Sequence, residues 1–325
     1  RFHKLNNNYI MKNIYTNIFS FNNKVLKKTI KALKQGNIAG LPTETVYGLA
    51  GNAYSIGAVR KIFKLKKRPK KNPLIIHFYD KKNLKKDVKI NNHFSKLYDK
   101  LCPGPITFIL KKRKKSKIVD LAISRQNTVA VRFPNHKVAR AILKKTVFPL
   151  AMPSANISSK LSPVNAIDVS EEFKEKLKII INGGKSKIGI ESTVIDLTGK
   201  PKILRPGIIS SSEIKPFLKV SLAKKNMKIK SPGMMKKHYS PGIPIIFGGK
   251  PSKPTHAYLV FGKKFKKNPN NFNLSKNANL KEAAANLYKI LKKIKKRGFK
   301  KIFVAKIPNR GSGLAINDRL IRASK

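Results

Sequence analysis

Acidic residues are scarce in this chain. Its 325 residues include 14 Asp and Glu against 73 Lys and Arg, which gives a formal charge of +59. Such an excess favours polyanion binding, because Lys and Arg neutralise phosphates and release their counterions. Only 12 of the basic residues are Arg, and the lysines are spread over loops and helix faces alike, as compositional drift would produce. The charge therefore leaves drift and nucleic-acid binding as open alternatives.

Cysteine and long apolar runs are also nearly absent. The single cysteine, Cys102, excludes an internal disulfide and a multi-cysteine metal site, and it fits a reducing compartment. No apolar run approaches the roughly 18 residues that span a bilayer. The six histidines have no metal-ligand spacing, and the GxSxG, HExxH and CxxC motifs are missing. We expect a soluble, cytoplasmic protein with no membrane partner and no metal held by protein ligands.

Helical and strand patterns alternate along the chain, which predicts an α/β fold with a twisted mixed sheet and flanking helices. After residue 207 a region rich in Lys, Ser, Pro and Gly resists regular structure. A second series of strands and helices follows it and predicts a smaller, Rossmann-like α/β domain. The expected divisions are a disordered extension at 1–12, a catalytic domain at 13–207, an interdomain linker at 208–244 and a C-terminal domain at 245–325.

The segment 55–77 concentrates cations beside a buried strand. Ser55 is the expected N-cap of a helix that ends before Pro69. The basic run FKLKKRPKKNPLIIH then offers Arg68 for bidentate oxygen contacts, lysines as point charges, and an amide at Asn72. This mixture suits a nucleotide triphosphate, whereas the alternative is an exposed basic loop.

The strand TVAVRF at 128–133 alternates two kinds of side chain. Val129 and Val131 share one face, while Thr128 and Arg132 share the other. We therefore expect a hydroxyl and a guanidinium to point into the same space.

Other polar residues follow apolar strands. Ser154, Asn156 and Ser162 come after the strand FPLAM, and the rare acid Glu191 immediately precedes Ser192. Ligands of α/β sheets bind at such strand ends, although Ser and Asn form ordinary turns there as well.

Taken in order, these motifs resemble a known family. PTETVYGL, the K-x-R of Lys66 and Arg68 followed by NPL, PGPITFIL, TVAVRFP, PSAN, ESTVIDL, LRPG, SPGMMKKHYSP and GSGLAINDRLIRAS resemble those of the YrdC-domain L-threonylcarbamoyladenylate synthases in their long, two-domain form. The resemblance covers about residues 13–325. It departs from the family pattern at YGLAGNA, at Ser159 and at Met235-Lys236-Lys237.

The resemblance implies a reaction and its partners. L-threonine, bicarbonate and ATP, with Mg²⁺ on the phosphates, would give threonylcarbamoyl-AMP and pyrophosphate. A downstream complex would transfer the threonylcarbamoyl group to adenosine 37 of tRNA, with at most a weak tRNA contact by this chain. Such chemistry needs no side-chain nucleophile, only positioning and charge neutralisation.

The resemblance also implies site residues. For L-threonine they are Thr45, His77, Thr128, Arg132, Met152 and Ser192. For ATP they are Lys66, Arg68, Asn72, Thr128, Ser154, Asn156, Ser162, Arg205 and Tyr239. Lys66, Arg68 and Arg132 would stabilise charge, and Tyr239 would bring the linker over the active site as a lid. Glu44 is expected to orient backbone amides or a cation such as Lys66.

Two other functions compete with this one. A non-catalytic tRNA-binding or double-stranded RNA-binding protein would explain the charge, but it would not need Arg132, His77 and Ser192 together. A hydrogenase-maturation carbamoyltransferase would need zinc-finger cysteines, and the chain has only Cys102.

Overall fold

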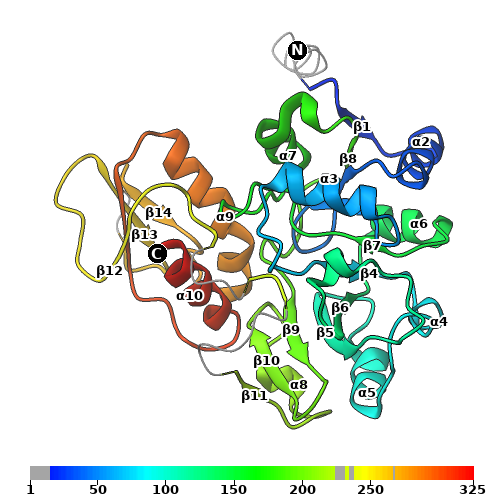
Figure 1. The fold of residues 1–325 in the computed structure, drawn as a ribbon. Helices are drawn as coiled ribbons and strands as arrows, with labels where there is room; N and C mark the ends of the chain where they lie inside the picture. Colours follow the sequence, from blue (N-terminus) through cyan, green and yellow to red (C-terminus); the bar gives the residue numbers. More distant parts are fainter. Residues whose placement is uncertain (1–14, 224–230, 234–237, 266–267) are drawn as a thin grey trace.

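A large mixed sheet organises the first two thirds of the chain. The computed structural model describes residues 15–223, 231–233, 238–265 and 268–325, so the expected extension at 1–12 and parts of the expected linker lie outside the described residues. Eleven strands form this sheet (Figure 1). In spatial order they are β1 (Ile18–Ser20), β8 (Ile180–Asn182), β2 (Ala39–Leu41), β3 (Gly48–Asn52), β7 (Leu150–Ala151), β4 (Ile75–His77), β6 (Thr128–Arg132), β5 (Ile106–Lys111), β9 (Thr193–Asp196), β10 (Lys202–Arg205) and β11 (Ser221–Leu222).

Helices cover both faces of this sheet because its strands alternate two sets of apolar side chains. Leu49 and Ile180 pack in one cluster, and their neighbours Ala50 and Ile181 pack in another. The first cluster includes residues of α3 (Ile56–Lys66), α5 (Asn92–Leu101) and α7 (Ala166–Phe173), and the second includes residues of α2 (Asn23–Lys34) and α6 (Lys137–Lys145). The short helices are α4 (Lys81–Leu84), α8 (Ser211–Ile214), η1 (Asp120–Ile123) and η2 (Lys174–Lys176).

Side-chain caps begin the helices where the sequence offers Ser or Asn. The Ser55 hydroxyl accepts the amide hydrogen of Ala58 at 3.2 Å, which confirms the expected start of α3. That helix ends at Lys66, and Lys67 adopts the left-handed conformation with φ of 48°. The chain then turns immediately toward β4, so the basic segment 66–72 lies beside the strands that form the site.

The strand pairings bring distant polar residues to one region. β4 pairs with β6 in parallel, with His77 opposite Arg132, and β4 pairs with β7 in the antiparallel sense. An isolated bridge joins Gly48, at the start of β3, to Ser154. Residues from four segments far apart in sequence therefore meet on neighbouring strands in the middle of this sheet.

The last third of the chain forms a second sheet that is parallel throughout. Its order is β12 (Ile245–Phe247), β15 (Lys301–Val304), β13 (His256–Val260) and β14 (Asn271–Asn273). Two helices, α9 (Leu280–Lys296) and α10 (Ser312–Ala323), supply much of its apolar core. This arrangement confirms the expected smaller α/β domain (Figure 1).

Helix α9 packs closely against the first sheet domain. Gly189 has φ of 75°, and a Cβ atom there would lie 2.6 Å from the Ala285 Cα of α9, so this position requires glycine. The Lys292 ammonium forms an ion pair with Asp168 of α7 at 2.7 Å. The lysine-bearing side of α9 therefore contacts the neighbouring domain at Lys292. Over the described ranges, no helix is long and apolar enough to cross a membrane.

Candidate active site

A cavity lies against the middle strands of the large sheet. Its walls come from the corner before β3, the loop after α3, the strands β4 and β6, the segment after β7, the start of β9, the end of β10, and the segments 232–233 and 238–239. The lining residues are Thr43, Val46, Tyr47, Gly48, Arg68, Ile75, His77, Arg132, Met152, Pro153, Ser154, Glu191, Arg205, Pro232, Gly233, His238 and Tyr239.

Two of the lining arginines are held by neutral oxygens. Arg68 donates to the backbone carbonyl of Asn72 at 2.9 Å and to its side-chain oxygen at 2.7 Å. Arg205 donates to the carbonyls of Ser192 at 2.9 Å and Pro232 at 3.1 Å. Burial, together with the nearby charge of Arg205, lowers the pKa of Arg68 to about 9, although Tyr239 opposes this shift. An anion entering the cavity would relieve this uncompensated positive charge.

The third arginine is paired with an acid. The Nη2 atom of Arg132 lies 2.7 Å from Oε1 of Glu44, and both side chains are buried. The Nε atom of Arg132 and Oε2 of Glu44 have no hydrogen-bond partner. Burial, and then the adjacent charge of Arg132, lower the pKa of His77 well below its ordinary value, so this imidazole is neutral. Glu44 thus orients a cation as expected, but that cation is Arg132 and not Lys66.

Lys66 supports the loop that forms one wall. Its ammonium donates to the backbone carbonyls of Ser154 and Asn156. Burial, and then the charge of Arg68, lower its pKa well below the ordinary value. Its head group is therefore committed to the PSAN turn, and Lys66 does not line the cavity.

The sequence-predicted site residues fall into three groups. Those that line the cavity are Arg68, His77, Arg132, Met152, Ser154, Arg205 and Tyr239. Those that support the lining from behind are Thr45, Lys66, Asn72, Asn156, Ser162 and Ser192. Thr45 bonds to Thr43, Lys66 to carbonyls of the PSAN turn, and Asn72 to Arg68. Asn156 bonds to the carbonyls of Ile157 and Lys160, Ser162 to Glu191, and Ser192 to Arg205. Thr128 alone forms the third group, because it neither lines the cavity nor supports its lining.

Thr128 lies at the far end of β6 from the cavity. It opens the strand that Arg132 closes, and four residues of extended chain separate the two by about 13 Å. It lines a different surface hollow together with Lys89, Lys111 and Lys112. The shared face of TVAVRF was predicted correctly, but sharing a face does not bring two residues into the same space when they occupy opposite ends.

Several lining residues were not among the predicted ligands. Thr43 lines the cavity where Thr45 was expected, and its hydroxyl bonds to that of Thr45 at 2.9 Å. His238 adjoins Tyr239, with ring centroids 4.0 Å apart. The HYSP motif and the rarity of acids were the signals that could have added His238 and Glu191.

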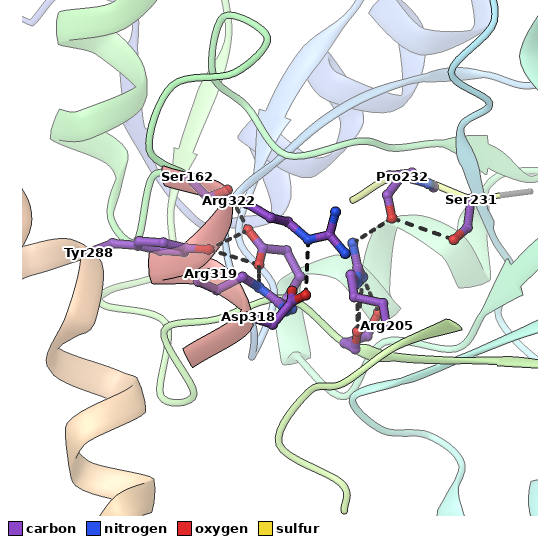
Figure 2. Close-up of polar contacts among 10 residues, drawn as sticks. Ser162, Arg205, Ser231, Pro232, Tyr288, Asp318, Arg319 and Arg322 are labelled. Atoms are coloured by element: carbon purple, nitrogen blue, oxygen red, sulfur yellow. Dashed lines mark hydrogen bonds and ion pairs between the residues drawn. The ribbon is translucent and has the colours of Figure 1, made fainter. Parts of the chain in front are cut away.

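Glu191 shares a buried hydrogen-bond network with Ser162, Tyr288 and Arg319, and these three partners are labelled in Figure 2. It accepts hydrogen bonds from Ser162 at 2.5 Å, Tyr288 at 2.9 Å and Arg319 at 3.0 Å. Burial alone would raise the pKa of Glu191, but Arg319 and then Arg205 outweigh that effect and lower it to about 2. Glu191 is therefore ionised.

Gly48 allows the cavity wall to close. A Cβ atom at this position would lie 2.3 Å from Cγ of Met152 and 2.8 Å from its sulfur. The Met152 side chain therefore occupies the volume that any other residue at 48 would need.

A family model matches the part of the chain that forms the cavity's main walls. The model for the Sua5, YciO and YrdC proteins, described as telomere recombination, matches residues 31–207, more than half of the chain. The chain belongs to the Sua5/YciO/YrdC family. A second model, described as the C-terminal domain of threonylcarbamoyl-AMP synthase, matches residues 209–325. The resemblance found in the sequence is thereby confirmed.

Members of this family with full-length similarity include two curated relatives. A threonylcarbamoyl-AMP synthase of Pyrococcus abyssi is 36% identical over 314 residues, covering 90% of this chain and 92% of the relative. A threonylcarbamoyl-AMP synthase of Bacillus subtilis is 33% identical and covers 95% of each chain. The crystal structure of Pyrococcus abyssi Sua5 complexed with L-threonine superposes with a TM-score of 0.84 at 33% identity, covering 94% of this chain and 96% of that one.

Proposed function

We propose that this chain is an L-threonylcarbamoyladenylate synthase, a nucleotidyltransferase that joins L-threonine, bicarbonate and ATP and releases pyrophosphate. The observation that carries this proposal is the cavity itself, where three buried guanidinium groups, Arg68, Arg132 and Arg205, face one space. The carboxylate of threonine and the triphosphate of ATP both need such cationic groups. Relatives named for this activity match nearly the whole chain.

The cavity divides into a threonine side and a nucleotide side. The guanidinium of Arg132 would bind the threonine carboxylate through two parallel hydrogen bonds. Its Nε has no partner, and the ion pair of its Nη2 with Glu44 already orients the group. Neutral His77 and the side chain of Met152 complete that side. Thr45 would act from behind this wall, through Thr43. Ser192 contacts Arg205 and would therefore support the nucleotide side instead.

On the nucleotide side, Arg68 and Arg205 would bind the triphosphate. Tyr239 and Ser154 line the same space, whereas Lys66, Asn72, Asn156 and Ser162 would hold its walls. Thr128 has no role in this assignment, because it opens onto another surface.

The reaction then needs orientation and charge stabilisation. Bicarbonate takes up a proton, its C–O bond breaks, and water leaves to give carbon dioxide. The unprotonated threonine amine attacks the carbon of carbon dioxide, which forms the N–C bond of a carbamate, and the amine releases a proton that balances the one consumed. A carbamate oxygen attacks the α-phosphorus, a new P–O bond forms, and the bond to the β,γ-phosphates breaks to release pyrophosphate. Arg68 and Arg205 would stabilise the developing negative charge.

Magnesium would accompany ATP as part of the substrate. The two acids at the cavity are committed, Glu44 to Arg132 and Glu191 to Arg319, Tyr288 and Ser162. Throughout the described residues, no group of three or more His, Cys, Asp or Glu side chains could hold a metal. Mg²⁺ would therefore be coordinated by phosphate oxygens and water, neutralising part of their charge.

We further propose the working context of this activity. The catalytic domain would run from residue 13 past the expected boundary at 207, because Ile214 of α8 packs in its core and β11 extends its sheet. The linker would lie between β11 and the C-terminal domain at 245–325, and its residues 232–233 and 238–239 line the cavity. The enzyme would act in the cytoplasm and pass its product to a threonylcarbamoyl-transfer complex that modifies tRNA. A non-catalytic RNA-binding role would leave the enclosed arrangement of Arg132, His77 and Met152 without a use.

Pyrophosphate release tests the proposed function directly. The full chain is supplied with ATP and Mg²⁺, and threonine and bicarbonate are omitted in turn. Release that requires both is expected. Release that persists without either one would contradict the synthase assignment and point to a simple ATP hydrolase.

A further inference from the structure

The C-terminal domain places one buried arginine directly behind the cavity. Arg319 of α10 is 1% exposed, and its Nε donates to Glu191 at 3.0 Å across 128 residues of sequence. Tyr288 of α9 reaches the same carboxylate at 2.9 Å. Figure 2 shows Arg319 and Tyr288 converging from the two C-terminal helices. The C-terminal domain thus fixes an acid that lines the cavity.

Arg319 also contacts the segment that covers the cavity. Its guanidinium lies over the ring of Tyr239, 5.1 Å from the centroid, and that ring stacks on Tyr288 at 5.9 Å. Tyr239 has φ of 63°, a conformation that costs energy for a side chain of this size and needs support from its surroundings. The cation–π contact and the stacking hold Tyr239 in this strained position.

Helix α10 prepares Arg319 for this task. Asp318 accepts from Arg319 Nη1 at 2.8 Å and from Arg322 Nε at 3.0 Å. The carbonyl of Arg322 accepts the amide hydrogen of His238 at 3.2 Å. Side-chain and backbone contacts from one helix therefore fix both His238 and Tyr239.

The same contacts continue to the nucleotide side. Glu191 is followed by Ser192, whose carbonyl and hydroxyl accept from Arg205 at 2.9 and 3.1 Å. Tyr239 OH and Arg319 Nη2 are buried and have no hydrogen-bond partner. A buried donor without a partner is costly, and Tyr239 lines the cavity, so its hydroxyl indicates a polar ligand or water on this side.

We propose that Arg319 is a positioning residue for the nucleotide. Arg319 contacts Tyr239 and Glu191, and by fixing these two lining residues it would position the part of the cavity wall where Arg205 binds the ATP phosphates. The C-terminal domain thereby completes the nucleotide side while leaving the threonine side, formed by Arg132, His77 and Met152, untouched. This inference rests on the proposed function for its reaction, but its structural content is ATP binding alone.

The test compares Arg319→Met with Arg319→Lys and with a control, Lys292→Met. The control removes another ion pair between the domains, with Asp168 at 2.7 Å, from a residue that does not line the cavity. ATP affinity is measured by calorimetry, and the KM values for ATP and threonine are measured by pyrophosphate release. We expect Arg319→Met to weaken ATP binding at least tenfold and to raise the ATP KM to match. The threonine KM should stay within twofold of the wild type.

Arg319→Lys should recover part of the ATP affinity, and Lys292→Met should retain all of it. An unchanged ATP affinity in Arg319→Met, or an equal loss in the Lys292→Met control, would overturn the inference. Should Arg319→Met fail to fold by circular dichroism, Arg319→Lys carries the comparison on the same criterion. Calorimetry keeps the two proposals separable, because wild-type release that ignores threonine would reject the synthase function without altering the ATP-affinity result.

Discussion

Removing Arg132 should have two consequences that a second substitution can separate. In Arg132→Met, the fork for the threonine carboxylate is lost, and Glu44 keeps a buried charge without its 2.7 Å partner. A charge-assisted hydrogen bond contributes about 1.5 to 3 kcal/mol, so the threonine KM should rise about 10- to 150-fold. Breaking a buried ion pair costs about 3 to 5 kcal/mol, which should lower Tm by roughly 6 to 20 °C.

Adding Glu44→Gln should rescue only the second effect. The neutral amide removes the uncompensated charge, so the double variant should regain most of the lost Tm in a calorimetric scan. Its threonine KM, measured by pyrophosphate release, should remain as high as in Arg132→Met, because the fork is still absent. Glu44→Gln alone should keep a threonine requirement close to the wild type. Recovery of threonine dependence in the double variant would show that Arg132 acts only by holding the fold, and the assignment of the threonine side would be refuted.

Three further outcomes follow from the structure. Gly48→Ala should reduce pyrophosphate release, because its Cβ would lie 2.3 Å from Met152 Cγ and would displace the wall; unchanged kinetics would contradict that packing. The pKa of Glu191 is lowered from 4.5 to about 2, so the stability it contributes is complete above about pH 4.5 and is lost as pH falls toward 2. That loss is about 3 kcal/mol, and urea unfolding at several pH values should show it in the wild type but not in Glu191→Gln. Raising salt from about 50 to 200 mM should weaken tRNA association strongly while leaving product formation from the small substrates unchanged, and a parallel fall in both would argue against drift as the source of the basic charge.

The strands and helices with a clear period were predictable from sequence. Alternation in TVAVRF predicted β6, the apolar run ITFIL predicted β5, and an apolar stripe predicted α9, because each element buries apolar side chains in a core. The edge strands β1, β11 and β14 have only two or three residues and no apolar run around them, so they depend on pairing with their neighbours and were not predicted. The strands that matter most to the site, β4 and β6, were predicted, because β4 lies in the apolar run PLIIHF and β6 in TVAVRF.

The residues of the candidate site were largely predictable from sequence, but which of them line the cavity and which lie behind the lining was not. Polar residues after apolar strands do collect in one region, as the parallel pairing of His77 with Arg132 requires. Which of them touch the cavity depends on tertiary packing, since Lys66 turns to two backbone carbonyls and Thr45 lies behind Thr43. Sequence spacing does not encode these choices. The meeting of Arg319 with Glu191 lies further still from local pattern, because it joins two domains.

The few acids that the chain retains are more informative about function than its large excess of basic residues. Of the 14 acids in the chain, four are buried: Glu44, Asp87, Glu191 and Asp196. Two of these, Glu44 and Glu191, each hold an arginine beside the same cavity. A lysine in either place would set two like charges in contact in a buried site, at a cost that surface lysines never meet. These two buried positions therefore require a carboxylate, whatever the origin of the basic charge on the exposed faces.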